Sequence, residues 1–408
     1  MKTVLYTLAI SSVVFLASCS SDDDVSEMNE DNVMINNPTN YSFERSEENT
    51  VSFSGQTTRI LMAQELLGGF TANTNTAESL QAMYAHEEGA ADFEDADLNT
   101  SDKSLRSKTA ASVDYFSTNA TDQALIRADF ESWIDGQVNE VFANWDVTAE
   151  AGIAGQLADG EKTRYVNAQG LEYNQLFAKG LLGALMTDQA LNNYLSTAVL
   201  DEGSSRADND AGTVLEGKSY TNMEHKWDEA YGYVYGLNAD ASNPNADLGA
   251  DKFLNEYIGK LEEDTDFAGI ADEIFQAFKL GRAAIVAGDY DVRDAQAEII
   301  RGKISQVIAV RGIYYLQQAK ATLAAETPNY GSAFHALSEA YGFIYSLRFT
   351  RQPGTDGAYF SKEDSNELLE ELMEDGVNGL WDVTAETIDE ISEDIAEEFD
   401  FTVVQAGE

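Results

Sequence analysis

Two stretches of this chain decide its fold: residues 220–237 read YTNMEHKWDEAYGYVYGL, and residues 330–347 read YGSAFHALSEAYGFIYSL. At a constant offset of 110 residues they share a tyrosine, a histidine, the run Glu-Ala-Tyr-Gly, a further tyrosine and a leucine. Their apolar residues recur at helical spacing, which predicts helices over 221–237 and 331–349. A repeat of this kind predicts an internal duplication, with repeats around 171–245 and 292–354 that form two lobes related by a pseudo-twofold axis.

The rest of the chain from residue 59 onward shows the same helical periodicity. Three of only four prolines, Pro244, Pro328 and Pro353, fall between the predicted helices, as helix-terminating residues do. Residues 41–58 predict a short extended lead-in, and the polar stretch 89–119 predicts a loop or an insertion. The sequence therefore predicts an all-α domain over 41–408, a two-lobed bundle of eight to ten helices. The further predicted helices are 59–68, 122–144, 171–199, 266–287, 292–326, 363–374 and 384–399.

The composition excludes several classes of function. The 408 residues carry a net charge of −47, with 72 acidic against 25 basic side chains, which argues against binding to nucleic acid or to an anionic membrane surface. A single cysteine rules out internal disulfides and cysteine-based metal centres, and only three histidines are available for imidazole chemistry. The sequence also lacks the GxSxG, P-loop and GxGxxG motifs of serine hydrolases, nucleotide-binding proteins and Rossmann domains.

The N-terminus has the pattern of an export signal. Residues 1–18 (MKTVLYTLAISSVVFLAS) hold one lysine, an apolar run too short for a spanning helix, and small residues, which predicts a signal peptide. Residues 16–19 (LASC) resemble the lipobox of bacterial lipoproteins, which implies cleavage and lipidation at Cys19. Residues 19–40 are polar and acidic without periodicity, which predicts a disordered tether. The acidic run 21–24 resembles a surface-export signal, so we expect an outer-membrane lipoprotein on the periplasmic face or cell surface, with an outer-membrane transporter as a candidate partner.

The repeated helices carry the candidate metal site. His225 and Glu229, like His335 and Glu339, are four residues apart and therefore share one helical face. If the two halves pack about a pseudo-twofold axis, the pairs converge at the centre, where two imidazoles and two carboxylates suit a divalent metal such as Zn or Fe better than Ca. The other interpretation is that each pair is a half-buried hydrogen-bonded pair of the scaffold.

Glycines and tyrosines of the same motif are candidates for a ligand pocket. The glycine seven residues after each histidine leaves room for a ligand or for a crossing helix. The tyrosines either line this pocket or belong to the core. The candidate pocket residues are Tyr231, Gly232, Tyr235, Tyr341, Gly342 and Tyr345.

Three further patterns are weaker. His86 is not followed by the second histidine of a zinc-protease motif, and we expect it at the surface. The acidic loops 208–212 and 240–247 do not match the twelve-residue calcium-binding loop. The hexapeptide WDVTAE occurs at 145–150 and at 381–386, where we expect its threonine to cap the helix that follows.

The export signal, the acidic tether, SFSGQTTR (52–59) and HKWDEAYG (225–232) together resemble a bacterial lipoprotein family of unassigned function. The layout is more distantly similar to the imelysin-like proteins, which are helical, two-lobed extracytoplasmic proteins with a GxHxxE motif. That resemblance implies a role in iron or haem acquisition, with the motif histidine on His225 and its acid on Asp228, or on Glu229 if the spacing is one residue longer. Met223 replaces the leading glycine of the motif, and the second repeat has Ser338 at the position of Asp228.

Three functions remain open at this point. The first is a lipoprotein that binds a metal ion or a metal complex, such as iron or haem, for a neighbouring transporter. The second is an imelysin-like metallopeptidase with Glu229 or Glu339 as the general base for a metal-bound water. The third is a non-enzymatic structural or interaction scaffold. We favour the binding protein, because the chain lacks a recognised protease signature.

Overall fold

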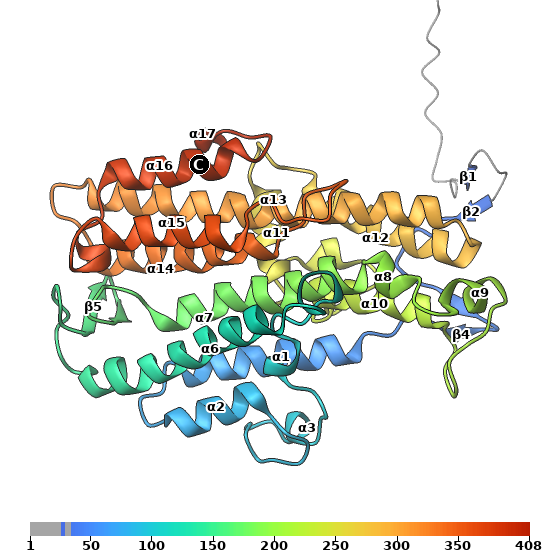
Figure 1. The fold of residues 1–408 in the computed structure, drawn as a ribbon, viewed down its shortest axis with the longest axis horizontal. Coiled ribbons are helices and arrows are strands. Elements are labelled where there is room, and N and C mark those ends of the chain that lie inside the picture. The colour runs from blue at the N-terminus through green and yellow to red at the C-terminus, as the bar shows by residue number, and fades with distance from the viewer. Residues whose placement is uncertain (1–25, 29–33) are drawn as a thin grey trace, which may run out of the picture.

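The longest helix, α13 (Tyr290–Leu323), forms the spine of the computed structural model, which describes residues 26–28 and 34–408. At about 1.5 Å per residue, α13 is about 50 Å long. The helix before it, α12 (Ile270–Ala287), packs along its N-terminal half, and the helix after it, α14 (Tyr330–Ser346), packs along its C-terminal half (Figure 1). The three helices thus place the second repeated motif, on α14, at one end of the molecule.

Capping residues set the ends of these helices. Gly288 adopts a left-handed conformation with φ 78° that ends α12. The side chain of Asp289 then accepts a hydrogen bond from an amide in the first turn of α13. The first repeated motif forms α10 (Asn222–Tyr235), which starts with a capping box between Thr221 and Glu224.

Helices dominate the described residues, so the predicted all-α class is confirmed. The other α-helices are α1 (Ser54–Gly69), α2 (Ala77–Ala85), α3 (Ala96–Asn99), α4 (Leu105–Lys108), α5 (Val113–Phe116), α6 (Ala120–Gly136), α7 (Tyr173–Leu181), α8 (Thr197–Leu200), α9 (Ser205–Asp210), α11 (Leu254–Glu263), α15 (Lys362–Glu374), α16 (Ala385–Glu397) and α17 (Val403–Ala406). Shorter segments are the π-helices η1 (Gln137–Val141), η3 (Leu182–Thr187) and η4 (Ala190–Tyr194) and the 3-10 helices η2 (Phe142–Asn144), η5 (Pro244–Asp247), η6 (Leu347–Phe349) and η7 (Gly379–Trp381). The strands form three antiparallel pairs, β1 (Ser26–Met28) with β2 (Met34–Asn36), β3 (Glu44–Arg45) with β4 (Glu48–Asn49), and β5 (Gly155–Asp159) with β6 (Lys162–Val166).

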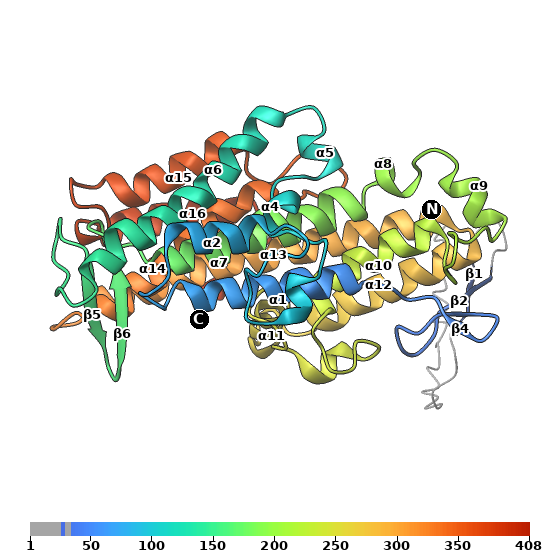
Figure 2. The same ribbon diagram turned by 90° about the horizontal axis from the view of Figure 1, so that it is seen from below.

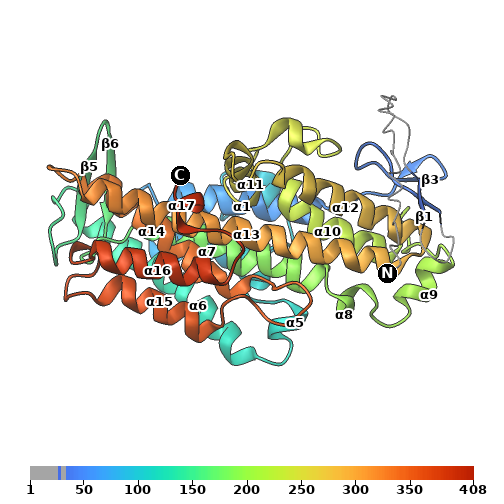
Figure 3. The same cartoon turned by 90° about the horizontal axis from the view of Figure 1, so that it is seen from above.

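The two motif helices lie towards opposite ends of the long axis of the molecule, as the three views agree (Figures 1, 2 and 3). The β5–β6 hairpin lies at the α14 end, and the other strands lie at the α10 end (Figure 2). α10 packs on α1 and α12, whereas α14 packs on α7 and α13. The internal duplication stays a prediction.

Several element boundaries differ from those predicted. α1 begins inside the predicted lead-in, and the predicted loop 89–119 contains the single-turn helices α3, α4 and α5. The predicted helix 171–199 is interrupted, because α7 continues as the π-helical segments η3 and η4 before α8. The helices α2 and α11 and the β5–β6 hairpin have no counterpart among the predicted elements. This hairpin closes through a two-residue turn in which Gly160 has φ 60°, a conformation that favours glycine.

Part of the predicted tether is folded. Ile35 in β2 is 1% exposed, and β2 packs against α12. The Lys279 ammonium on α12 donates to the carbonyl of Thr39 at 3.1 Å. The apolar side chain within a polar segment thus anchors the chain ahead of residue 41. The predicted signal peptide 1–18 and Cys19 lie outside the described residues.

The hexapeptide WDVTAE leads into a helix at only one of its two positions. Thr384 caps α16 as expected, but Thr148 precedes β5 and not a helix, so its predicted capping role is wrong.

Within residues 26–28 and 34–408, none of the helices is sufficiently long and apolar to span a bilayer.

Candidate functional site

The candidate site of the second repeat joins the start of α7 to the first turns of α14. His335 lies with Nδ1 2.8 Å from Oε2 of Glu172 and with Nε2 3.7 Å from Oε2 of Glu339. A carboxylate only accepts hydrogen bonds, so Nδ1 is the donor, and a neutral imidazole with its proton there has its lone pair on Nε2. The imidazole is therefore held between two carboxylates, with Nδ1 towards Glu172 and Nε2 towards Glu339.

His335 and Glu339 line a cavity of about 630 Å³, the α14 cavity, whose walls come from α1, α7, α11, α13 and α14. Three lysines also line it, Lys162, Lys179 and Lys252, although only 25 of the 408 residues are basic. Two carboxylates, Glu256 and Glu339, lie among them. The wall is thus rich in ammonium groups within a strongly acidic chain.

Lys179 and Glu339 form an ion pair in the wall of the α14 cavity. Nζ lies 3.1 Å from Oε1, and the two side chains are only 8% and 9% exposed. The same ammonium lies 5.0 Å from the ring centre of Tyr257, whose hydroxyl donates to Oε1 of Glu339 at 3.5 Å. Burial, and after it the Glu339 carboxylate, raises the pKa of Tyr257 well above its ordinary value. One oxygen of Glu339 is therefore held by a cation and a hydroxyl, and the other faces His335.

The first repeat holds its histidine in a similar way but surrounds its glutamate differently. His225 donates from Nδ1 to the carbonyl oxygen of Ser52 at 3.0 Å, and burial lowers its pKa. Glu229 accepts hydrogen bonds from Lys226 at 2.9 Å and from Gln56 at 3.2 Å. Burial acts to raise the pKa of Glu229, but the charges of Lys226 and His225 outweigh it and lower the pKa. No hydrogen bond joins His225 to Glu229 in the part of the chain that the structure describes.

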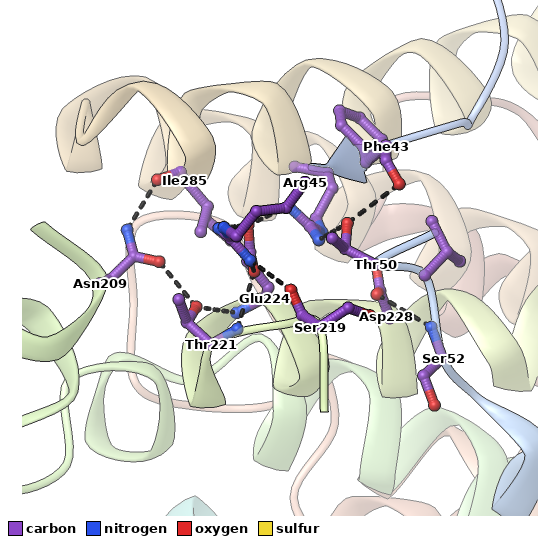
Figure 4. A network of polar contacts seen from close by, with 12 residues as sticks. Phe43, Arg45, Thr50, Ser52, Asn209, Ser219, Thr221, Glu224, Asp228 and Ile285 are labelled. Atoms are coloured by element: carbon purple, nitrogen blue, oxygen red, sulfur yellow. Dashed lines mark hydrogen bonds and ion pairs between the residues drawn. The ribbon is translucent and has the colours of Figure 1, made fainter. Parts of the chain in front are cut away.

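Asp228, the alternative acid of the first repeat, belongs to a buried network. It accepts hydrogen bonds from Nε of Arg282 at 3.1 Å, from the hydroxyl of Tyr41 at 2.7 Å and from the amide of Ser52 at 3.1 Å. Burial raises its pKa to about 6, while the Arg282 guanidinium acts to lower it. Figure 4 shows Glu224 and Asp228 on α10 facing the N-terminal segment that contributes Ser52. These contacts tie α10 to α12 and to that segment, so Asp228 serves the fold.

The motif glycines are contact points between helices. A Cβ atom on Gly232 would meet Cβ of Phe53 at 2.4 Å, and one on Gly342 would meet Cβ of Lys179 at 2.5 Å. α10 therefore crosses the chain at the start of α1, and α14 crosses α7. Of the two interpretations of these glycines, the crossing helix is correct and the open pocket is wrong.

The motif tyrosines belong to the core. Tyr231, Tyr235 and Tyr345 are at most 3% exposed, and Tyr341 packs against the same cluster. None of them lines the α14 cavity. Of their two predicted roles, the core role is correct.

The structure does not bring the two His–Glu pairs together. His225 contacts Ser52, two residues before α1, and His335 contacts Glu172, the residue before α7. Their helices α10 and α14 lie towards opposite ends of the molecule (Figure 3). Within the described ranges, no group of three or more His, Cys, Asp or Glu side chains is arranged to hold a metal ion. The described residues thus do not show the predicted convergence of the two pairs, because His225 is bound to the segment ahead of α1 and His335 to the N-cap residue of α7. The role of each pair as metal ligands stays a prediction. The prediction that His86 lies at the surface is also wrong. His86 is 4% exposed, and its Nδ1 lies 2.7 Å from Oδ2 of Asp92.

Sequence reasoning missed three residues of the site, namely Glu172, Lys179 and Tyr257. Glu172 and Lys179 are the only charged residues between positions 171 and 187. Charged residues in such an apolar helical stretch are rarely buried without partners. The presence of Glu172 and Lys179 in this stretch therefore indicates ionic contacts of both side chains. Tyr257 lies on α11, a helix that the sequence analysis does not predict.

Comparison with known proteins places the chain in a family without assigning an activity. No curated protein and no solved structure matches it. Residues 38–402 match the family model described as domain of unknown function (DUF4856). Because this match covers most of the chain, the protein belongs to the DUF4856 family.

Proposed function

We propose that this protein is an extracytoplasmic binding protein that captures a metal complex in the α14 cavity. The observation that carries the proposal is the position of His335 between Glu172 and Glu339 on the wall of this cavity. The metal is the cargo of the protein, and its organic ligand carries acidic groups.

The His335–Glu339 pair supplies the ligands for the metal. Metal bonds to imidazole nitrogen and carboxylate oxygen are about 2.0–2.2 Å long, so two of them span separations up to about 4 Å. Nε2 of His335 and Oε2 of Glu339 are 3.7 Å apart, within that reach. Glu172 then acts as the carboxylate that commonly orients a metal-binding histidine through its other ring nitrogen. A nitrogen and oxygen donor set suits Fe or Zn.

Two protein ligands leave most coordination positions to the cargo itself. A complex fits this arrangement better than a bare ion, because the chelator fills the remaining positions. Lys162 and Lys252 make no ion pair within the described residues, and both line the α14 cavity. Their ammonium groups support binding of a carboxylate-bearing chelator.

The binding test compares matched histidine variants. Ferric citrate and FeCl2 serve as probes, measured by titration calorimetry and by metal content after gel filtration of the purified protein. We expect His335→Ala and Glu339→Gln to lose ferric citrate binding, whereas His225→Ala keeps it. Circular dichroism checks that each variant is folded.

Other outcomes overturn the proposal. Equal uptake by all four proteins would leave surface cation binding or a scaffold role. Peptide hydrolysis that disappears in Glu339→Gln would establish the metallopeptidase instead.

The location is proposed from the sequence pattern around Cys19. An acylated Cys19 would hold the folded domain at the outer membrane, close to a transporter that receives the cargo. In the native host, Cys19→Ser is expected to abolish incorporation of labelled palmitate and to move the protein out of the membrane fraction. A variant that remains in that fraction would contradict the lipid anchor.

A further inference from the structure

A second cluster of charged residues lies on α1, α4 and α10, away from the α14 cavity. Arg59 on α1 is 6% exposed and forms no ion pair within the described residues. Its guanidinium donates to the carbonyl oxygens of Ser104 at 3.3 Å and Gly55 at 3.3 Å. Buried arginines normally have a carboxylate partner, and this chain has 72 acidic residues from which to supply one. An unpaired buried arginine is therefore unexpected here.

Lys108 at the end of α4 is the second cation without an acidic partner. It is half-buried, and its Nζ lies 5.6 Å from the ring centre of Tyr194. Among the described residues it makes no hydrogen bond and no ion pair. Burial, and after it the charge of Arg59, lowers the pKa of Lys108. The two cations thus lie at the same short helix, since Arg59 donates to Ser104 at the N-cap of α4 and Lys108 is its last residue.

Lys226 on α10 completes the cluster. Its Nζ lies 5.4 Å from the centre of the same Tyr194 ring and 2.9 Å from Oε2 of Glu229. Among the three cations Glu229 forms an ion pair only with Lys226 within the described residues, and Gln56 donates to its other oxygen. The cluster of Arg59, Lys108 and Lys226 therefore carries a surplus of positive charge.

We infer that Arg59, Lys108 and Lys226 form a binding site for a small oxyanion of about the size of phosphate. A guanidinium and two ammonium groups present the donors that such oxygens accept, and charge-assisted hydrogen bonds of this kind are the stronger ones. Lys226 is 28% exposed, so an anion from solvent can reach the cluster. The net charge of −47 disfavours approach of a large polyanion, which limits the ligand to a small one.

None of these three residues lines the α14 cavity, so the anion site and the metal-complex site are tested by different variants. The test uses the purified protein in a buffer without phosphate or sulfate. Thermal unfolding and titration calorimetry are followed with sodium phosphate and with sodium chloride at equal ionic strength. Lys108→Gln removes one cation of the site, and Lys260→Gln removes an exposed cation elsewhere.

We expect phosphate to raise the unfolding temperature of the wild type and of Lys260→Gln, but not that of Lys108→Gln. The affinity for phosphate should fall about tenfold or more in Lys108→Gln, the loss expected for one charge-assisted hydrogen bond. Without phosphate, Lys108→Gln should unfold at a higher temperature than the wild type, because the repulsion between Lys108 and Arg59 is removed.

Two results would overturn the inference. The first is an equal effect of chloride and phosphate on the wild type. The second is a Lys108→Gln protein that unfolds at a lower temperature and still responds to phosphate, since Lys108 would then act only by packing on Tyr194.

Discussion

Glu172 fixes the orientation of His335 through a hydrogen bond between Oε2 and Nδ1 at 2.8 Å. The other carboxylate oxygen of Glu172, Oε1, is buried and has no hydrogen-bond partner among the described residues. Burying an acceptor without a donor costs free energy. Within the described residues, the one side-chain hydrogen bond of Glu172 is the bond that holds Nδ1 of His335 and turns Nε2 towards Glu339.

Glu172→Gln tests this orienting contact. The amide group of glutamine can accept from Nδ1 or donate to it, so the tautomer with its lone pair on Nε2 is no longer enforced. We expect the affinity for ferric citrate to fall about 10- to 100-fold, as is usual when the partner of a metal-binding histidine is lost. Titration calorimetry measures the change, and Glu256→Gln provides a control with the same charge change in the α14 cavity. If both variants bind like the wild type, Glu172 does not orient a metal ligand.

Gly342→Ala tests the crossing of α14 over α7. The new methyl group would meet Cβ of Lys179 at 2.5 Å and the amide nitrogen of Gly180 at 3.2 Å. Overpacking of this kind lowers the free energy of unfolding by about 1–3 kcal/mol. Gly68→Ala on α1 is the matched control, because its methyl group would meet nothing within 4 Å and should stabilise the helix by up to about 1 kcal/mol. Urea unfolding that ranks the two variants in the opposite order would refute the close crossing.

The sequence predicts the motif helices well because their signals are local. Apolar residues at helical spacing define α10 and α14, and Pro328 marks the break between α13 and α14. The partners of the motif could not be predicted in this way. Glu172 contacts a residue 163 positions away, and nothing in the spacing of either segment specifies that pairing.

The motif glycines Gly232 and Gly342 also show that sequence spacing does not predict which residues pack together. A glycine beside His335 indicates that a side chain is excluded, but not what occupies the space. The structure fills it with the backbone and Cβ of α7, whereas the α14 cavity is lined by His335, Lys179 and Glu339. Helix faces can thus be derived from periodicity, whereas the neighbour of a face depends on the packing of the whole chain.

Arg282→Met tests the network that holds Asp228. Arg282 is fully buried and pairs with Asp228 and with Glu224, each at 3.1 Å. Removing the guanidinium leaves two buried carboxylates without this cation, which should lower the free energy of unfolding by about 3–5 kcal/mol. Arg206→Met removes an ion pair with Asp201 in which the arginine is 49% exposed, and it should cost less than about 1 kcal/mol. Chemical unfolding of both variants measures the difference, and similar losses would contradict a central role for Arg282.

Asp251→Asn tests how a buried carboxyl group contributes to the pH dependence of stability. Asp251 is 3% exposed, Oδ1 accepts a hydrogen bond from the Phe253 amide at 2.7 Å, and Oδ2 has no partner within the described residues. Burial raises the pKa of Asp251 to about 7, whereas an unfolded aspartate has a pKa of about 3.9. The folded state therefore binds the proton more tightly than the unfolded state, and protonation stabilises the fold. This contribution is complete below about pH 4 and is lost as the pH rises towards 7.

Asparagine does not titrate, so the comparison of the two proteins isolates Asp251 from the other carboxylates. Each unit of pKa difference corresponds to about 1.4 kcal/mol, and we expect Asp251→Asn to gain stability relative to the wild type between pH 4 and pH 8. Urea unfolding at a series of pH values measures the difference, with the exposed Asp266→Asn as the control that should show no such trend. A stability difference that stays constant over this range would mean that Asp251 titrates alike in the folded and unfolded chains. In that case its burial would not have weakened the charged form, and Oδ2 would have to be solvated in the native protein.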